Sequence, residues 1–187
     1  MGNNSSLPHH DLKDIQAETQ FLTGEIKELY SRFTSLDTGN KGWLCREDLL
    51  CIPELSNNLL CERIVHAIFK ESENEQLNFR QFVHSMARFR RIKNSKENKL
   101  NNRIEKLRFV FRVYDLDDDN HISLGELREA LHAMVGENIS EEQLNNIAER
   151  TINDADLDGD KMISFDEFCA SLERTEFEEL MTIVFLR

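Results

Sequence analysis

The sequence has no apolar run of about 18 residues, which is the length that a membrane-spanning helix requires. Its N-terminus is polar and lacks the apolar stretch of a signal peptide. Its four cysteines, at positions 45, 51, 61 and 169, form no CxxC pair, which favours reduced and mostly buried thiols in a cytosolic protein. Acidic residues outnumber basic ones, with 35 Asp and Glu against 23 Lys and Arg. The net charge of −12 argues against a general nucleic-acid binder.

No Ser/His/Asp or Cys/His combination suggests a nucleophilic active site, so we do not expect an enzyme. The 187 residues are 40% hydrophobic and include 12 phenylalanines. This is enough apolar material for two small lobes or one larger domain.

Two twelve-residue stretches carry acidic residues in the order of an EF-hand calcium loop. A calcium ion needs six to eight oxygen ligands, which such a loop supplies from positions 1, 3, 5, 7 and 12. Position 7 contributes a backbone carbonyl, and position 9, here Ser123 or Ser164, acts through water. One solvated acidic run is common, but two copies with the same ligand order are not. The predicted ligands are Asp115, Asp117, Asp119, His121 and Glu126 in the first stretch, and Asp156, Asp158, Asp160, Met162 and Glu167 in the second.

Each stretch departs from the EF-hand pattern at position 6, where glycine usually supplies a positive φ. Asn120 tolerates that conformation, whereas Lys161 should cost about 1–2 kcal/mol. If the whole cost falls on the bound state, the second site binds calcium about tenfold more weakly. The site is still expected to bind because all its oxygens are present.

Two further loops have lost ligands. The loop 37–48 has Gly39 and Lys41 at positions 3 and 5 and Asp48 at position 12, so oxygens are missing and a positive charge points at the site. The loop 70–81 begins with Lys70 and ends with Gln81. Neither loop is expected to bind calcium. Helical apolar spacing surrounds all four loops, with one unit about every 35–40 residues. Position 8, which in paired hands forms a short two-stranded contact, stays apolar in each loop, at Leu44, Leu77, Ile122 and Ile163.

This pattern predicts an all-α fold, with two pairs of EF-hands in two lobes that share a hydrophobic groove. The predicted division is an N-terminal segment with a helix (1–22), an N-lobe of two degenerate hands (23–89), a basic linker (90–103), a C-lobe of two calcium-binding hands (104–175) and an apolar tail (176–187). The helix leaving the first loop should break at Ile52-Pro53-Glu54.

Three segments suggest contacts outside the lobes. Gly2, with Ser6 four residues later, fits an N-myristoylation signal. A single myristoyl chain anchors only marginally. The basic stretch 88–102 is either a solvated linker, a second membrane signal or a site for acidic partner segments. The tail is either docked on the core, which we favour, or a cover for the groove, or an export signal.

The chain resembles the calcineurin B homologous proteins, a branch of the neuronal calcium sensor and calcineurin B superfamily. The resemblance spans almost the whole chain and rests on Leu29–Asp37, Ile52–Leu55, Phe111–Asp115, Met134–Gly136, Asn138–Ser140 and Phe185-Leu186. Two degenerate hands followed by two intact ones match that branch, whereas calcineurin B itself has four intact loops.

The resemblance implies a myristoylated calcium-binding subunit of plasma-membrane sodium/proton exchangers, whose groove binds a hydrophobic juxtamembrane helix. It also implies two Ca²⁺ ions, calcineurin inhibition, a cytoplasmic protein at the plasma membrane, and nuclear shuttling. The alternatives are a calcineurin B-type subunit that binds the phosphatase catalytic chain, and a calcium buffer without a protein partner.

Overall fold

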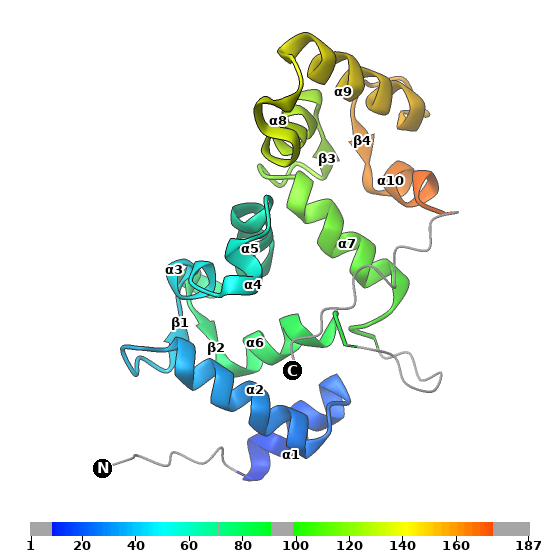
Figure 1. Ribbon diagram of the computed structural model, residues 1–187. Helices are drawn as coiled ribbons and strands as arrows, with labels where there is room; N and C mark the ends of the chain where they lie inside the picture. Colours follow the sequence, from blue (N-terminus) through cyan, green and yellow to red (C-terminus); the bar gives the residue numbers. More distant parts are fainter. Residues whose placement is uncertain (1–8, 71, 91–98, 174–187) are drawn as a thin grey trace.

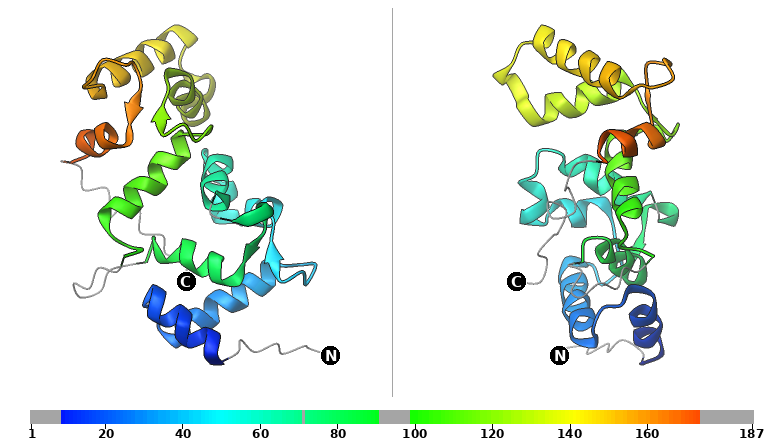
Figure 2. Two further views of the ribbon diagram at one scale, coloured as in Figure 1. Left: turned by 180° about the vertical axis from the view of Figure 1, so that it is seen from behind. Right: turned by 90° about the vertical axis from the view of Figure 1, so that its right-hand side faces the viewer.

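A computed structural model describes residues 9–70, 72–90 and 99–173, with helices and four short strands (Figure 1). The acylation signal at Gly2, most of the basic linker and the apolar tail lie outside the described residues. The helices form two groups at opposite ends of the described chain, as the two further views in Figure 2 also show. No helix in the described part of the chain is long and apolar enough to cross a membrane.

The first group comprises α1 (His9–Thr19), α2 (Thr23–Leu36), α3 (Arg46–Leu50), α4 (Pro53–Ser56), α5 (Cys61–Phe69) and α6 (Phe79–Ala87), with a 3-10 turn η1 (Glu73–Glu75). Strands β1 (Trp43–Leu44) and β2 (Leu77–Asn78) pair antiparallel, with Leu44 opposite Leu77. Pro53 is the first residue of α4, which confirms the expected break after α3.

The second group comprises α7 (Arg103–Tyr114), α8 (Leu124–Val135), a 3-10 turn η2 (Gly136–Asn138), α9 (Glu141–Ala155) and α10 (Phe165–Ser171). Strands β3 (His121–Ile122) and β4 (Ile163–Ser164) pair antiparallel, with Ile122 opposite Ile163. In both groups the apolar position 8 of one loop therefore faces that of the next, as the sequence predicts. The all-α architecture of paired helix-loop-helix units is confirmed.

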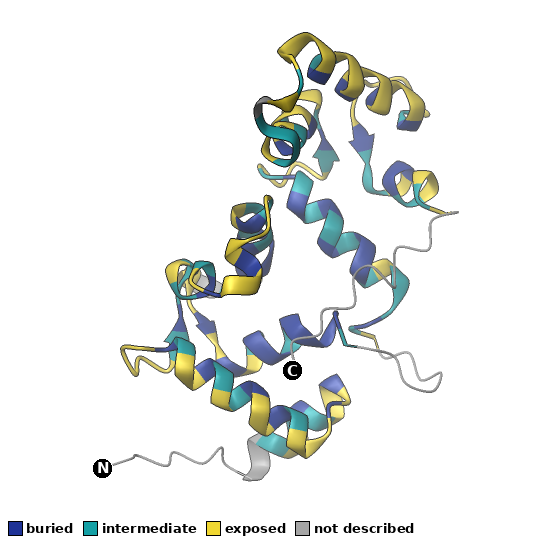
Figure 3. Cartoon of the chain, in the orientation of Figure 1, coloured by how far each residue is buried: buried dark blue, intermediate teal, exposed yellow. Residues whose placement is uncertain are grey.

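Helix α7 belongs to both groups. Phe109 and Val113 lie in the apolar core of the first group, whereas Leu107 and Phe111 lie in that of the second. Phe109 contacts Phe89 edge-on, with ring centroids 4.9 Å apart. The buried positions in Figure 3 follow α7 along its whole length. A helix with apolar residues on both sides is buried on both sides, so α7 connects the two halves.

The structure extends the predicted N-lobe at both ends. Ile15, Thr19 and Phe21 are buried in the first group, so α1 and the turn after it are part of this lobe rather than a separate segment. Arg88 and Asn101, near the two ends of the basic stretch 88–102, are also buried. The interpretation of 88–102 as a solvated linker is therefore wrong for these two residues, because the ends of the stretch pack against the fold.

Candidate metal centres and apolar groove

The loop Asp115–Glu126, the third of the four along the chain, brings three predicted ligands together. Carboxylate oxygens of Asp115, Asp117 and Glu126 lie within 4.8 Å of one another. Glu126 Oε1 accepts the backbone N–H of Leu116 at 2.8 Å, and Glu126 Oε2 accepts the hydroxyl of Ser123 at 2.7 Å. Bonds to loop positions 2 and 9 thus hold the position-12 carboxylate beside the two aspartates, where a bidentate calcium ligand is needed.

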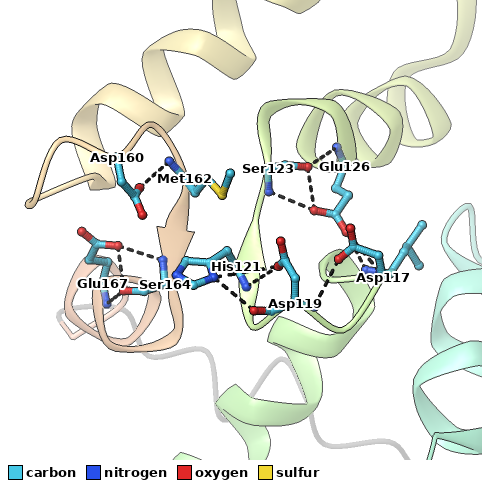
Figure 4. A network of polar contacts seen from close by, with 10 residues as sticks. Asp117, Asp119, His121, Ser123, Glu126, Asp160, Met162, Ser164 and Glu167 are labelled. Atoms are coloured by element: carbon cyan, nitrogen blue, oxygen red, sulfur yellow. Dashed lines mark hydrogen bonds and ion pairs between the residues drawn. The ribbon is translucent and has the colours of Figure 1, made fainter.

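The fourth loop, Asp156–Glu167, repeats this arrangement. Carboxylate oxygens of Asp156, Asp158 and Glu167 lie within 4.8 Å of one another. Glu167 Oε1 accepts the backbone N–H of Leu157 at 2.7 Å, and Glu167 Oε2 accepts the hydroxyl of Ser164 at 2.7 Å. The same network in two loops far apart in sequence indicates that each loop is shaped around its position-12 carboxylate (Figure 4).

The aspartates at position 5 are not in these carboxylate groups. Asp119 Oδ1 accepts the backbone N–H of His121, and Asp160 Oδ1 that of Met162, both at 2.8 Å. These bonds fix the residue at position 7, whose carbonyl is the predicted ligand.

The serines at position 9 cap the exiting helices. Ser123 accepts the backbone N–H of Glu126, and Ser164 that of Glu167, and each pair forms a capping box. The hydroxyls therefore orient the position-12 glutamates. Their predicted contact with the ion through water stays a prediction.

Position 6 has the positive φ that the pattern requires. The φ of Asn120 is 66° and that of Lys161 is 68°. Lys161 thus adopts the conformation that the sequence predicted to be strained, although calcium affinity itself stays a prediction.

The buried atoms of the third loop fit a cation. Asp115 is 2% exposed, and its Oδ1 has no hydrogen-bond partner among the described residues. Burial raises the pKa of Asp115, although Lys70 nearby opposes the shift. A buried carboxylate oxygen without a partner costs free energy, and a hard cation that prefers oxygen ligands would supply the missing contact.

The position-12 glutamates are held as anions. The backbone N–H of Leu157, followed by the hydroxyl and N–H of Ser164, lowers the pKa of Glu167 to about 2. Burial alone would raise the pKa of Glu126, but hydrogen bonds from Ser123 and from the backbone of Leu116 and Asp117 lower it. Both residues are therefore charged at neutral pH, as a metal ligand must be.

The first degenerate loop carries its own cation. The ammonium of Lys41, at position 5, donates to Asp48 Oδ2 at 2.8 Å, so it neutralises the position-12 carboxylate. Asp37 at position 1 accepts the backbone N–H groups of Lys41 and Gly42 at 2.9 and 2.7 Å. The loop therefore keeps its turn without a bound ion.

Two adjoining apolar hollows along α7 form an apolar trough. One hollow of about 350 Å³ lies between α7 and the first group of helices, and a second of about 660 Å³ lies between α7 and the second group. Val110 and Tyr114 line both, so the hollows meet along this helix. The other apolar lining residues are Leu49, Ile52, Leu55, Leu60, Ile64, Ile68, Phe82, Met86, Phe89, Phe109 and Val113 in the first hollow, and Ile122, Leu127, Ala155, Ile163, Phe168 and Leu172 in the second. The groove that the sequence predicts between the two pairs of hands would run through both hollows, and its continuity stays a prediction.

Arg63 and Lys70 were missed at the sequence level. Both belong to the second degenerate hand, yet their side chains contact the third hand. The available signal was a cation at position 1 of a loop that is not expected to hold an ion. The partner of Lys70, the carbonyl of Asp115, is 45 residues away and could not be identified from spacing.

Comparison with known proteins agrees with this geometry. The family model of the EF-hand domain pair matches residues 104–173, which contain both acidic loops. The chain is 40% identical over 181 residues to calcineurin B, a subunit of calcineurin, from Naegleria gruberi, and the match covers 97% of each chain. The fold and loops define a paired EF-hand protein of the calcium-binding type. Within that class, the chain belongs to the calcineurin B-like family.

Proposed function

We propose that this protein is a calcium-binding regulatory subunit whose groove binds one amphipathic helix of a partner protein. The apolar trough along α7 carries the proposal. A helix with apolar residues at i, i+3, i+4 and i+7 can bury that face in such a groove. The two acidic loops lie in the hands that form one wall of the trough, so bound calcium would fix that wall.

The relative's name favours a phosphatase catalytic chain as the partner. The Naegleria gruberi protein is by name a subunit of calcineurin, and the match to it spans nearly the whole chain. The calcium ions predicted at Asp115–Glu126 and Asp156–Glu167 would serve there as resident ions.

A cytosolic helix of a sodium/proton exchanger is the second candidate partner. The observation that favours it is the pair of degenerate loops, with Lys41 bonded to Asp48 and Lys70 turned away to the third hand. These loops match the branch that the sequence resembles. In either complex, myristoylation of Gly2 and the basic stretch would support attachment to the cytoplasmic face of the plasma membrane, and nuclear shuttling would follow only from an export signal in the tail.

Binding assays with each partner test the proposal. Calcium-loaded protein with an intact Gly2 should bind a calcineurin catalytic chain or an exchanger juxtamembrane peptide, and which of the two it binds identifies the partner. Val110→Glu places a charge in the trough where both hollows meet. It should weaken binding about tenfold or more, as substitutions of central interface residues commonly do. Ile147→Glu is the matched control because Ile147, on α9, is 46% exposed and lies outside both the trough and the calcium loops.

Failure to bind either partner, with calcium present, would contradict the proposal and favour a calcium buffer. Equal loss of binding in Val110→Glu and Ile147→Glu would show that the trough is not the binding surface.

A further inference from the structure

Helix α5 presents two different faces to its surroundings. Ile64 and Ile68, four residues apart, line the groove beside α7. Arg63 and Lys70, seven residues apart, lie together on another side and contact the third hand. Residues at these spacings share a helix face. The same helix therefore forms part of the groove wall and contacts a calcium loop.

Arg63 caps the end of α7. Its guanidinium donates to the backbone carbonyls of Val113 and Tyr114, both at 3.4 Å, and to Glu129 of α8 at 3.1 Å. Carbonyls in the last turn of a helix lack intrahelical partners and form its negative end. The side chain of Arg63 is only 11% exposed, so this contact is largely shielded from water.

Lys70 reaches one residue further, into the third loop. Its ammonium donates to the backbone carbonyl of Asp115 at 2.8 Å and lies 2.5 Å from Asp118 Oδ1. The carbonyl of Asp115 and the side chain of Asp118, at position 4, are not predicted calcium ligands. Lys70 can therefore hold the loop without competing for the oxygens that would bind the ion.

We propose that Arg63 and Lys70 are positioning residues that couple cation binding in the third loop to the placement of α5. Their acceptors are the end of α7, Asp115 and Asp118 in the first part of the loop, and Glu129 in the middle of α8. An ordered loop holds these two helices in register. The fourth loop makes no such contact with α5 among the described residues. The third loop, rather than the fourth, should therefore control α5.

The consequence for the groove rests on the function proposed above. Because α5 carries Ile64 and Ile68, a change in its placement alters the wall opposite Val110 and Val113. Calcium in the third loop would then adjust the half of the groove formed by the degenerate hands, although those hands are not expected to bind an ion themselves.

Hydrogen exchange along the chain tests the coupling. Calcium added to the wild-type protein should slow amide exchange in α5 (Cys61–Phe69) several-fold. Lys70→Met should largely abolish that calcium effect, and Lys70→Arg, which keeps the cation, should retain most of it. Glu126→Gln should abolish the effect, whereas Glu167→Gln at saturating calcium should leave it in place.

Calorimetry provides the reciprocal measurement. A coupling free energy acts in both directions. The combined variant Arg63→Gln, Lys70→Met should therefore bind calcium about five- to tenfold more weakly at the third loop, with the fourth loop unchanged. Arg80→Gln is the matched control because Arg80 pairs with Glu18, away from α5 and the third loop.

The proposal would be overturned if calcium still slowed amide exchange in α5 of Lys70→Met as much as in the wild type. It would also be overturned if Glu126→Gln and Glu167→Gln lost this calcium effect equally. A folded variant with slower or faster exchange throughout, but the same calcium response, would show a merely structural role and also overturn it. None of these measurements uses a partner. A protein that binds no helix but shows the coupling would lose the proposed function and keep this inference.

Discussion

The two pairs of hands have the same frame but balance their charge differently. In both pairs the loops meet through a short antiparallel contact, Leu44 with Leu77 and Ile122 with Ile163. In the first pair, a lysine ammonium lies against the position-12 carboxylate. In the second pair, the described carboxylates gather without a lysine bonded to the glutamate at position 12. The first pair should therefore be folded at any calcium concentration, whereas the second pair should depend on the ion.

Equivalent core phenylalanines should show this difference most strongly. Phe33 and Phe111 each stand four residues before the first loop residue, and their carbonyls accept the N–H groups of Asp37 and Asp115. Phe33 contacts Phe79 and Phe82, and we expect Phe33→Ala to cost about 3–5 kcal/mol with or without calcium.

Phe111→Ala should cost a similar amount with calcium but much less in chelator, where the second core is already loosened. Phe111 contacts Phe165 and Phe168. Native-state hydrogen exchange of both variants, with calcium and with chelator, measures the four values. A Phe33→Ala cost that changes with calcium would show that the ion affects the first pair beyond α5.

Removing the charge at position 12 should affect only one pair. Glu126→Gln should lower calcium affinity at the third loop by about 100-fold, because affinity depends on ligand charge and number. Calorimetry should then show one tight ion in place of two. Asp48→Asn, at the equivalent position of the first loop, is the control and should leave calcium binding unchanged.

Restoring ligands to the first loop is a direct attempt to remove the difference. The variant Gly39→Asp, Lys41→Asp, Asp48→Glu replaces the internal cation with carboxylates at positions 3, 5 and 12. The atoms nearest to a Cβ at Gly39 belong to the Lys41 side chain, which the design also replaces, and Gly42 already has a φ of 82° at position 6. Calorimetry should detect a third ion with a Kd of about 10⁻⁴ M. If no third ion binds, ligand identity alone does not explain the loss of the site.

Local pattern predicted much of this structure. The ligand spacing located both acidic clusters, the apolar position 8 predicted both strand pairs, and Pro53 predicted the break between α3 and α4. These features depend on residues close together in the chain, where periodicity and turn chemistry are informative.

Contacts between distant segments were not predicted. Charged residues are usually exposed, so a sequence pattern alone did not indicate that Arg88 is 5% exposed or that Lys70 reaches a loop 45 residues away. The position of Lys70 depends on the carbonyl of Asp115 and the carboxylate of Asp118, which only the fold brings near it. The position of α1 was also unexpected, because its weak amphipathic pattern does not show that α6 covers it.

The smallest expected effect tests the attachment of α1 in the first pair. Glu18 on α1 contacts both Arg80 and His84 on α6. Burial alone would raise the pKa of Glu18, but hydrogen bonds from Arg80 and His84 outweigh it, so the pKa lies below its usual 4.5. The stability from these contacts is therefore present above about pH 4.5 and is lost as the pH falls through the lowered pKa. Glu18→Gln should cost less than about 1 kcal/mol at pH 7, because the contact is partly exposed to solvent.

That cost should vanish in the acid range and should be the same with calcium and with chelator, since α1 packs in the calcium-independent half. Urea unfolding at several pH values measures it, and Glu149→Gln, on the exposed side of α9, is the control. A Glu18→Gln cost that grows when calcium is removed would show that the two pairs are coupled beyond α5. The division into an ion-independent and an ion-dependent half would then not hold.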